Sequence, residues 1–160
     1  MRRGAEEARV FPGILQYPLR MVKLLQDHGI TPLLVFDGGV LPAKREANRF
    51  RTEERARNKA EGEQLLREGE LERAKEKFRK ALSVSPTMCH QLVQHLKAMN
   101  VRFVVAPYEA DAQLAFLVRE RHALAAISED SDLLAYGCRR VLYKLNEHSA
   151  EGGFVRFDDL

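Results

Sequence analysis

The sequence contains only two cysteines, Cys89 and Cys138, which lie far apart in a chain of 160 residues. Neither belongs to a CxxC motif, which argues against a disulfide framework and a structural zinc site and favours an intracellular, reducing compartment. No apolar run approaches the roughly 20 residues that cross a membrane, so we expect no membrane association. The opening residues are charged and lack the apolar stretch of a signal peptide, so we do not expect secretion.

The charge of the chain is mildly basic, with 26 lysines and arginines, 23 acidic residues and an isoelectric point near 9.0. This balance leans towards a polyanionic partner, although the placement of charge is more informative than the total. Residues 44–59 contain seven basic residues and three acidic ones, which makes this segment a local cationic stripe. The length suits a single domain with a real hydrophobic core.

Apolar periodicity predicts helices that alternate with strands along the chain. The predicted helices cover 16–28, two parts of 43–82 separated near 68–70, 86–99, a helix that follows Pro107, and a short turn at 133–136. The predicted strands cover 30–39, 101–106, 124–127 and 140–145. This order predicts an α/β fold with a mainly parallel sheet flanked by helices.

Acidic residues follow three of the four predicted strands. They are Asp37, the pair Glu109 and Asp111, and the pair Asp130 and Asp132. Ligands of open α/β sheets gather beyond the carboxyl ends of the strands, so these five carboxylates are expected to converge. Divalent cations that prefer oxygen ligands would neutralise the cluster without proton uptake. The pattern therefore predicts two Mg²⁺ ions, replaceable by Mn²⁺, of the kind that serve phosphodiester cleavage.

Each acidic position also has a simpler interpretation. Asp37 could be an ordinary turn residue before glycine, and Asp130 or Asp132 could be the N-cap of the short helical turn that follows. Glu109 and Asp111 could favour the positive end of a helix. Side chains two positions apart on a regular helix point about 200° away from each other. At least one of Glu109 and Asp111 must therefore precede the regular helix if both face one site.

Three sequence blocks are similar to the flap endonuclease/XPG superfamily of structure-specific 5′ nucleases, and in particular to its exonuclease 1 branch. They are Leu34–Gly38 with Leu41 and Pro42, Val105–Ala115, and Ser128–Ala135. Gln64–Gly69 also resembles the exonuclease 1 branch. The resemblance implies a PIN-like XPG nuclease core with a helical arch insertion. It also implies that Asp37, Glu109, Asp111, Asp130 and Asp132 are metal ligands.

The same resemblance implies that Lys44 and Arg51 are catalytic residues that contact the scissile phosphate. They are seven positions apart, and that spacing would place them on one helical face. The implied activity is that of a 5′ to 3′ exonuclease and 5′ flap endonuclease in DNA repair and recombination. The implied partners are DNA with 5′ ends, nicks or flaps and other repair proteins, and we expect a nuclear monomer.

The chain departs from the superfamily pattern at its N-terminus. Residues 1–15 contain no aspartate, whereas the superfamily carries a further metal-binding aspartate on its first strand. We therefore expect 1–15 to be a non-matching segment and 16–160 to be part of a larger nuclease domain. Its predicted parts are the arch at about 43–82 and an XPG-I-like region at about 87–160.

Two other functions agree with parts of the sequence. A catalytically incomplete DNA-binding or interaction remnant would keep the sheet and lack a complete metal site. A helical scaffold is suggested by the tetratricopeptide-like pattern of residues 60–86, but no second copy appears at a 34-residue period, and such repeats require neighbours.

Overall fold

The computed structural model describes residues 12–159 and divides into two compact units. Unit 1 combines the segment that ends at Gly39 with the segment that begins at His90. Unit 2 is the intervening segment, Val40–Cys89.

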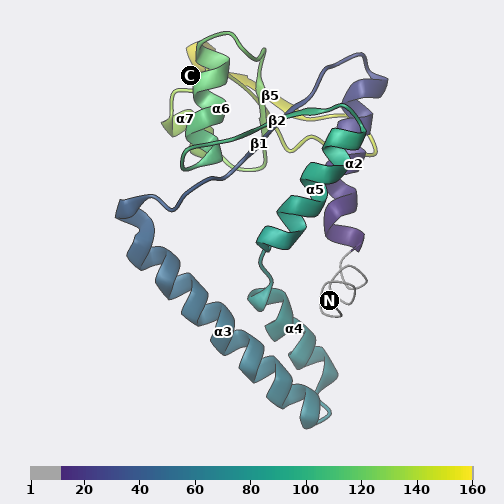
Figure 1. The fold of residues 1–160 in the computed structure, drawn as a ribbon, viewed down its shortest axis with the longest axis vertical. Helices are drawn as coiled ribbons and strands as arrows, with labels where there is room; N and C mark the ends of the chain where they lie inside the picture. Colours follow the sequence, from purple (N-terminus) through teal and green to yellow (C-terminus); the bar gives the residue numbers. More distant parts are fainter. Residues whose placement is uncertain (1–11, 160) are drawn as a thin grey trace. The chain divides into compact units, whose positions relative to one another are not determined.

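The first half of unit 1 is built on two parallel strands. Strand β1 (Leu33–Phe36) pairs with β2 (Arg102–Val105), with Leu33 opposite Arg102 and Phe36 opposite Val105. Helices α2 (Pro12–Asp27) and α5 (Pro86–Ala98) lie side by side against this pair (Figure 1). Gly29 ends the α2 segment with a positive φ of 71°, a conformation that glycine adopts without the penalty of a Cβ.

A mixed three-stranded sheet forms the second half of unit 1. Strand β3 (Ala126–Ser128) pairs in parallel with β4 (Arg140–Tyr143), and β4 pairs antiparallel with β5 (Gly153–Arg156). Helices α6 (Ala110–Arg119) and α7 (Asp132–Ala135) accompany this sheet, and a 3-10 turn, η2 (Phe157–Asp159), follows β5. The mainly parallel α/β fold is thereby confirmed. Strand β5 was not predicted, because four residues of a glycine-rich, largely exposed segment carry too short an apolar pattern.

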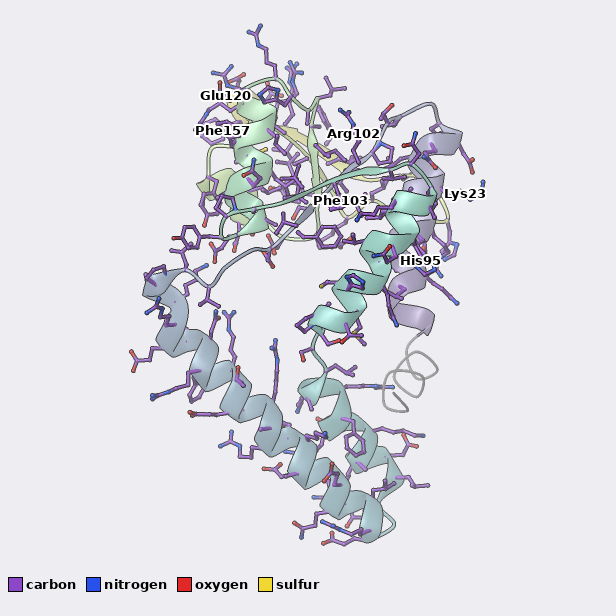
Figure 2. The ribbon with its side chains drawn as sticks, in the orientation of Figure 1. Lys23, His95, Arg102, Phe103, Glu120 and Phe157 are labelled. Atoms are coloured by element: carbon purple, nitrogen blue, oxygen red, sulfur yellow. The ribbon has the colours of Figure 1, made fainter. Side chains whose placement is uncertain are left out.

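Two clusters of buried side chains stabilise unit 1. The first joins α2, α5, β1 and β2 through Val22, Leu92, Leu96 and Val101, with Phe36 and Phe103 in edge-to-face contact at 6.1 Å between ring centres. Phe103 is labelled in Figure 2. The second joins α6, β3, α7 and β4. Its buried members are Ala115, Val118, Ala126, Leu133, Cys138 and Val141.

The strands of unit 1 form two sheets instead of one continuous sheet. Among residues 12–159, β1 pairs only with β2, and β3 pairs only with β4. A largely apolar groove of about 670 Å³ is lined by side chains of β1 and β3 together with others from α2 and α6. The remaining edge of each of these two strands has no strand partner in the described chain.

Unit 2 is a helical hairpin made of α3 (Arg45–Arg67) and α4 (Leu71–Ala81), preceded by the 3-10 turn η1 (Pro42–Lys44). The two helices meet where Gly62 faces the ring of Phe78, and a Cβ on that glycine would lie 2.9 Å from the ring. Ala74 is buried in the same contact, and Lys77 forms an ion pair with Glu61 that lowers the pKa of this carboxyl. The predicted break near 68–70 is confirmed, since Gly69 connects the helices with a φ of 82°. The described residues contain one such helix pair, which is too few for a repeat scaffold.

Candidate metal centre

Asp37 is held at the carboxyl end of β1 by a close contact between two chain segments. Its Oδ1 accepts a 2.8 Å hydrogen bond from the backbone N–H of Ala110, at the start of α6. The next two residues dock on the segment after β2, where the Gly38 N–H donates to the Tyr108 carbonyl at 2.6 Å and the Gly39 N–H donates to the Pro107 carbonyl at 3.0 Å. A Cβ on Gly38 would overlap the carbonyl oxygen of Ala106, so a glycine is required at this position.

Glu109 and Asp111 stand on either side of the point where α6 begins. Glu109 is the N-cap residue, with an extended backbone (φ −85°, ψ 137°), and Asp111 lies in the first helical turn. The prediction that one of the two must precede the regular helix is confirmed. The Tyr136 hydroxyl donates a 2.7 Å hydrogen bond to Glu109 Oε2 and so links this carboxylate to the end of α7. This link could not be predicted from the sequence, because it depends on how α7 folds back towards the start of α6.

Asp130 and Asp132 follow the carboxyl end of β3. The backbone N–H of Asp132, the first residue of α7, donates to Asp130 Oδ1 at 3.1 Å, and the Asp130 N–H donates to Ser128 Oγ at 3.3 Å. The N-cap of α7 is Ser131, so the simpler interpretation of either aspartate as the N-cap is wrong. Leu133, fully buried in the second core, anchors the short helix that carries Asp132.

The structure brings three carboxylates together. Asp111, Asp130 and Asp132 each offer an oxygen atom, and these oxygens all lie within 4.8 Å of one another. No lysine or arginine of residues 12–159 lies within ion-pair distance of these three side chains. Burial raises the pKa of Asp111, and the negative charges of Asp130, Asp132, Asp37 and Glu109 raise it further.

A set of hard carboxylate oxygens with uncompensated charge fits the ligand preference of Mg²⁺ or Mn²⁺. Of the five carboxylates expected to converge, Asp111, Asp130 and Asp132 form the group that could hold a metal ion. Asp37 and Glu109 act on the Asp111 carboxyl through their charge.

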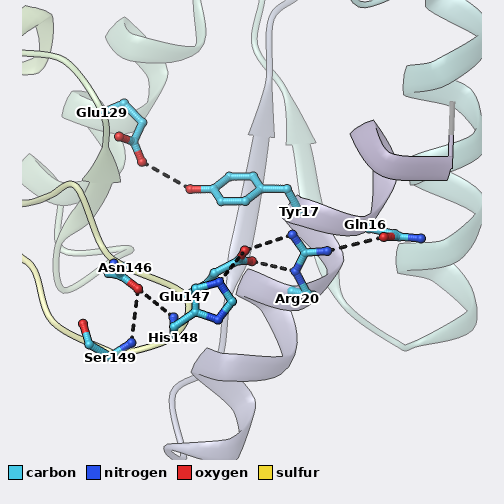
Figure 3. Close-up of polar contacts among 8 residues, drawn as sticks. All are labelled: Gln16, Tyr17, Arg20, Glu129, Asn146, Glu147, His148 and Ser149. Carbon is cyan, nitrogen blue, oxygen red and sulfur yellow. Dashed lines mark hydrogen bonds and ion pairs between the residues drawn. The ribbon is translucent and has the colours of Figure 1, made fainter.

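Helix α2 is tied to the loops that follow β3 and β4 (Figure 3). The Tyr17 hydroxyl donates a 3.2 Å hydrogen bond to Glu129, the neighbour of Asp130. The Arg20 guanidinium binds both oxygens of Glu147, at 2.7 and 2.9 Å. Sequence reasoning missed these contacts, since more than 100 residues separate the partners and neither helix pattern nor spacing predicts them.

Lys44 and Arg51 lie in unit 2 and are both exposed. Lys44 ends η1 and is the N-cap of α3, whereas Arg51 lies within α3. Arg51, Arg55 and Lys59 recur every four residues along this helix and thus share one face. None of these three forms an ion pair within the part of the chain that the structure describes, whereas Arg49 and Arg57 pair with Glu53 and Glu61. The roles of Lys44 and Arg51 stay predictions.

Two sequence-family profiles match the chain: the XPG N-terminal domain over residues 5–58 and the XPG I-region over residues 100–157. Together they cover more than half of the sequence, and the chain belongs to the XPG superfamily. The XPG I-region profile contains Glu109, Asp111, Asp130 and Asp132. The division at residue 15 stays a prediction.

Among individual proteins, the chain is similar to exonuclease 1. It is 43% identical to exonuclease 1 of Xenopus laevis over 133 residues, which are 83% of this chain and 18% of that protein. It is 45% identical to exonuclease 1 of Danio rerio over 133 residues, again 83% of this chain and 16% of that protein. The chain thus spans less than a fifth of the length of these relatives.

Solved structures share the fold. The catalytic core of Rad2 in complex with a DNA substrate matches with a TM-score of 0.66 and 26% identity, over 92% of this chain and 40% of that one. Flap endonuclease-1 from Methanococcus jannaschii matches with a TM-score of 0.57 and 25% identity, over 88% of this chain and 44% of that one.

No helix of residues 12–159 is long and apolar enough to cross a membrane.

Proposed function

We propose that this chain carries the metal-binding and phosphate-contacting part of a 5′ to 3′ DNA exonuclease and 5′ flap endonuclease. The observation that carries the proposal is the group of Asp111, Asp130 and Asp132, whose oxygens converge within 4.8 Å without a cationic partner in the described residues. When bound, two divalent cations supply an activated water and stabilise the leaving oxygen in phosphodiester hydrolysis.

The residues of the chain have separate tasks in this proposal. Asp111, Asp130 and Asp132 hold the cations directly, and Asp37 and Glu109 complete the acidic set. The Ala110 N–H orients the Asp37 carboxylate, and the Tyr136 hydroxyl orients that of Glu109. These contacts fix two side chains before substrate arrives, which reduces the reorganisation needed during the reaction.

Unit 2 supplies positive charge for DNA. Lys44 and Arg51 would neutralise the charge of the scissile phosphate. The cationic face of α3 formed by Arg51, Arg55 and Lys59 would contact further backbone phosphates, because binding without sequence preference requires only positive charge along the strand. The Rad2 catalytic core was solved in complex with a DNA substrate, which supports DNA as the partner. Location in the nucleus and a role in repair follow from the similarity to exonuclease 1.

The test separates metal binding from cleavage. Mn²⁺ titration by calorimetry measures the first, and degradation of a 5′-labelled nicked or flapped duplex, with and without Mg²⁺, measures the second. Asp132→Asn is expected to lower Mn²⁺ affinity by about tenfold or more, since even residues that only support a ligand contribute that much. Asp27→Asn is the matched control, because Asp27 is an exposed aspartate engaged only in a surface ion pair with Lys23. Its metal affinity should equal that of the unmodified chain.

The outcomes discriminate the two functions that the sequence left open. Mg²⁺-dependent cleavage that Asp132→Asn abolishes supports the nuclease. Metal binding that Asp132→Asn abolishes, without cleavage by the chain, favours the catalytically incomplete DNA-binding remnant. Equal Mn²⁺ affinity in the two variants would refute the metal site itself.

A further inference from the structure

Five arginines surround one cavity in unit 1, and none of them belongs to the acidic centre. The cavity measures about 650 Å³, and its walls include Arg119, Arg121, Arg139, Arg140, Arg156 and His122. These residues come from three separate stretches: the end of α6 with the turn after it, the start of β4, and the end of β5. Figure 2 labels Glu120, which follows α6, and Phe157, which follows β5, at the same end of the unit.

The strand pairing concentrates positive charge at this cavity. Arg140 and Arg156 stand directly opposite each other in the antiparallel pair β4–β5. Like charges in this arrangement destabilise a sheet unless an anion lies between or beside them. The Phe157 N–H donates to the Arg139 carbonyl at 2.9 Å and fixes the end of β5 next to the start of β4.

The carboxylates near the cavity compensate only part of the charge. Arg156 binds Asp159 at 2.9 and 3.1 Å, and Arg119 lies 3.2 Å from Glu120. Both are exposed surface ion pairs, which contribute little and exchange readily. Arg121, Arg139 and Arg140 have no carboxylate within ion-pair distance among residues 12–159, and Asp158 is the single acidic residue in the lining.

The cavity and the carboxylates lie at opposite ends of the parallel strands β3 and β4. Arg140 is the first residue of β4, whereas Asp130 and Asp132 follow the last residue of β3, which runs parallel to β4. At roughly 3.3 Å per residue, the two ends of β4 are about 10 Å apart. The cavity is therefore separate from the metal centre.

We propose that this arginine cavity is a binding site for phosphate groups. Guanidinium groups present paired N–H donors whose spacing matches two oxygens of a phosphate. Their convergence on a hollow, instead of a row along a groove, suits a compact group of neighbouring phosphates. The source is either a free polyphosphate or the phosphates of a nucleic acid strand. The proposal does not depend on the nuclease function.

The experiment measures binding of inorganic tripolyphosphate to the whole chain by calorimetry, in EDTA so that metal at the acidic centre plays no part. Arg140→Ala is expected to weaken binding by about tenfold or more, because it removes a charge-assisted contact. Arg102→Ala is the matched control, since Arg102 is likewise an exposed arginine at the first position of a strand. Arg139→Ala serves as a second variant should Arg140→Ala fail to fold.

A parallel titration with a short DNA duplex, also in EDTA, identifies the source. DNA binding that is weakened by Arg140→Ala and displaced by tripolyphosphate supports the site with a nucleic acid as its ligand. Binding of tripolyphosphate alone supports it with a free polyphosphate. No binding of either at about 0.15 M salt would overturn the proposal. Equal losses in Arg140→Ala and Arg102→Ala would overturn it as well, because they would indicate a diffuse effect of surface charge.

Discussion

Replacing Gly38 by alanine should damage both the fold and the metal centre. An added Cβ would overlap the Ala106 carbonyl oxygen and lie 2.9 Å from the carbonyl carbon. Both atoms belong to the backbone, so no side chain can rotate away, and the Asp37–Gly39 loop must move from the segment after β2. The movement disturbs the Asp37 carboxylate together with its neighbours.

The size of the effect follows from the contacts at risk. Two backbone hydrogen bonds join Gly38 to Tyr108 and Gly39 to Pro107, and one charge-assisted bond joins the Ala110 N–H to Asp37. At about 0.5–1.5 kcal/mol for each of the first two and about 1.5–3 kcal/mol for the third, their complete loss would cost roughly 2.5–6 kcal/mol. That is a large part of the roughly 5–15 kcal/mol that stabilises an ordinary domain.

Urea unfolding followed by circular dichroism measures this loss, with Gly153→Ala as the control. Gly153 lies in β5 with open space where a Cβ would stand and without a positive φ, so its replacement should change the free energy of unfolding by less than about 1 kcal/mol. Gly38→Ala should also weaken Mn²⁺ binding. Equal unfolding midpoints for the two variants would refute the reasoning.

Three further predictions concern other parts of the molecule. Leu133→Ala should destabilise unit 1 by about 2–5 kcal/mol in urea unfolding, because Leu133 is 0% exposed, whereas Leu124→Ala, at 79% exposure, should cost less than about 0.5 kcal/mol. Phe78→Ala should speed amide hydrogen exchange throughout α3 and α4 and leave exchange in β1–β4 unchanged; uniform acceleration would contradict it. Asp130→Asn should leave the metal-free melting temperature unchanged or raised, since it removes one of three crowded carboxylates, and should abolish the melting shift caused by Mn²⁺.

The fold could be predicted from the sequence where apolar runs and breakers coincide. Leu33–Phe36 and Arg102–Val105 lie within the predicted strands, and glycines 29, 69 and 137 mark helix ends with positive φ. Strand β5 was not predicted, because its four residues form a strand through pairing with β4 and not through an apolar pattern of their own. The separation of the strands into two sheets was not predicted either, since strand order depends on tertiary packing and cannot be read from apolar periodicity.

The convergence of the acidic side chains was predictable only in part. The parallel strands β1 and β2 align their carboxyl ends, which places Asp37 near the residues that begin α6. Strand β3 belongs to a separate sheet, so the approach of Asp130 and Asp132 to Asp111 depends on tertiary packing. The orienting contacts of Tyr136 and the Ala110 N–H were not predictable, because each depends on the distance between loops that the chain connects only through whole helices. The arginine cavity was hidden for the same reason, as Arg140 and Arg156 are brought opposite each other by the unpredicted β5.

Unit 2 lies, in chain order, between two strands that are immediate neighbours in space. The β1–β2 pair is parallel and so requires a long crossover in any case, and α5 already provides one that packs on the sheet. The entropic cost of closing such a connection rises only slowly with its length. The hairpin therefore adds little to the free-energy cost of pairing β1 with β2. Its length, charge and stability can therefore vary almost independently of the core, so this hairpin is a module that evolution or protein engineering could exchange without redesigning the sheet.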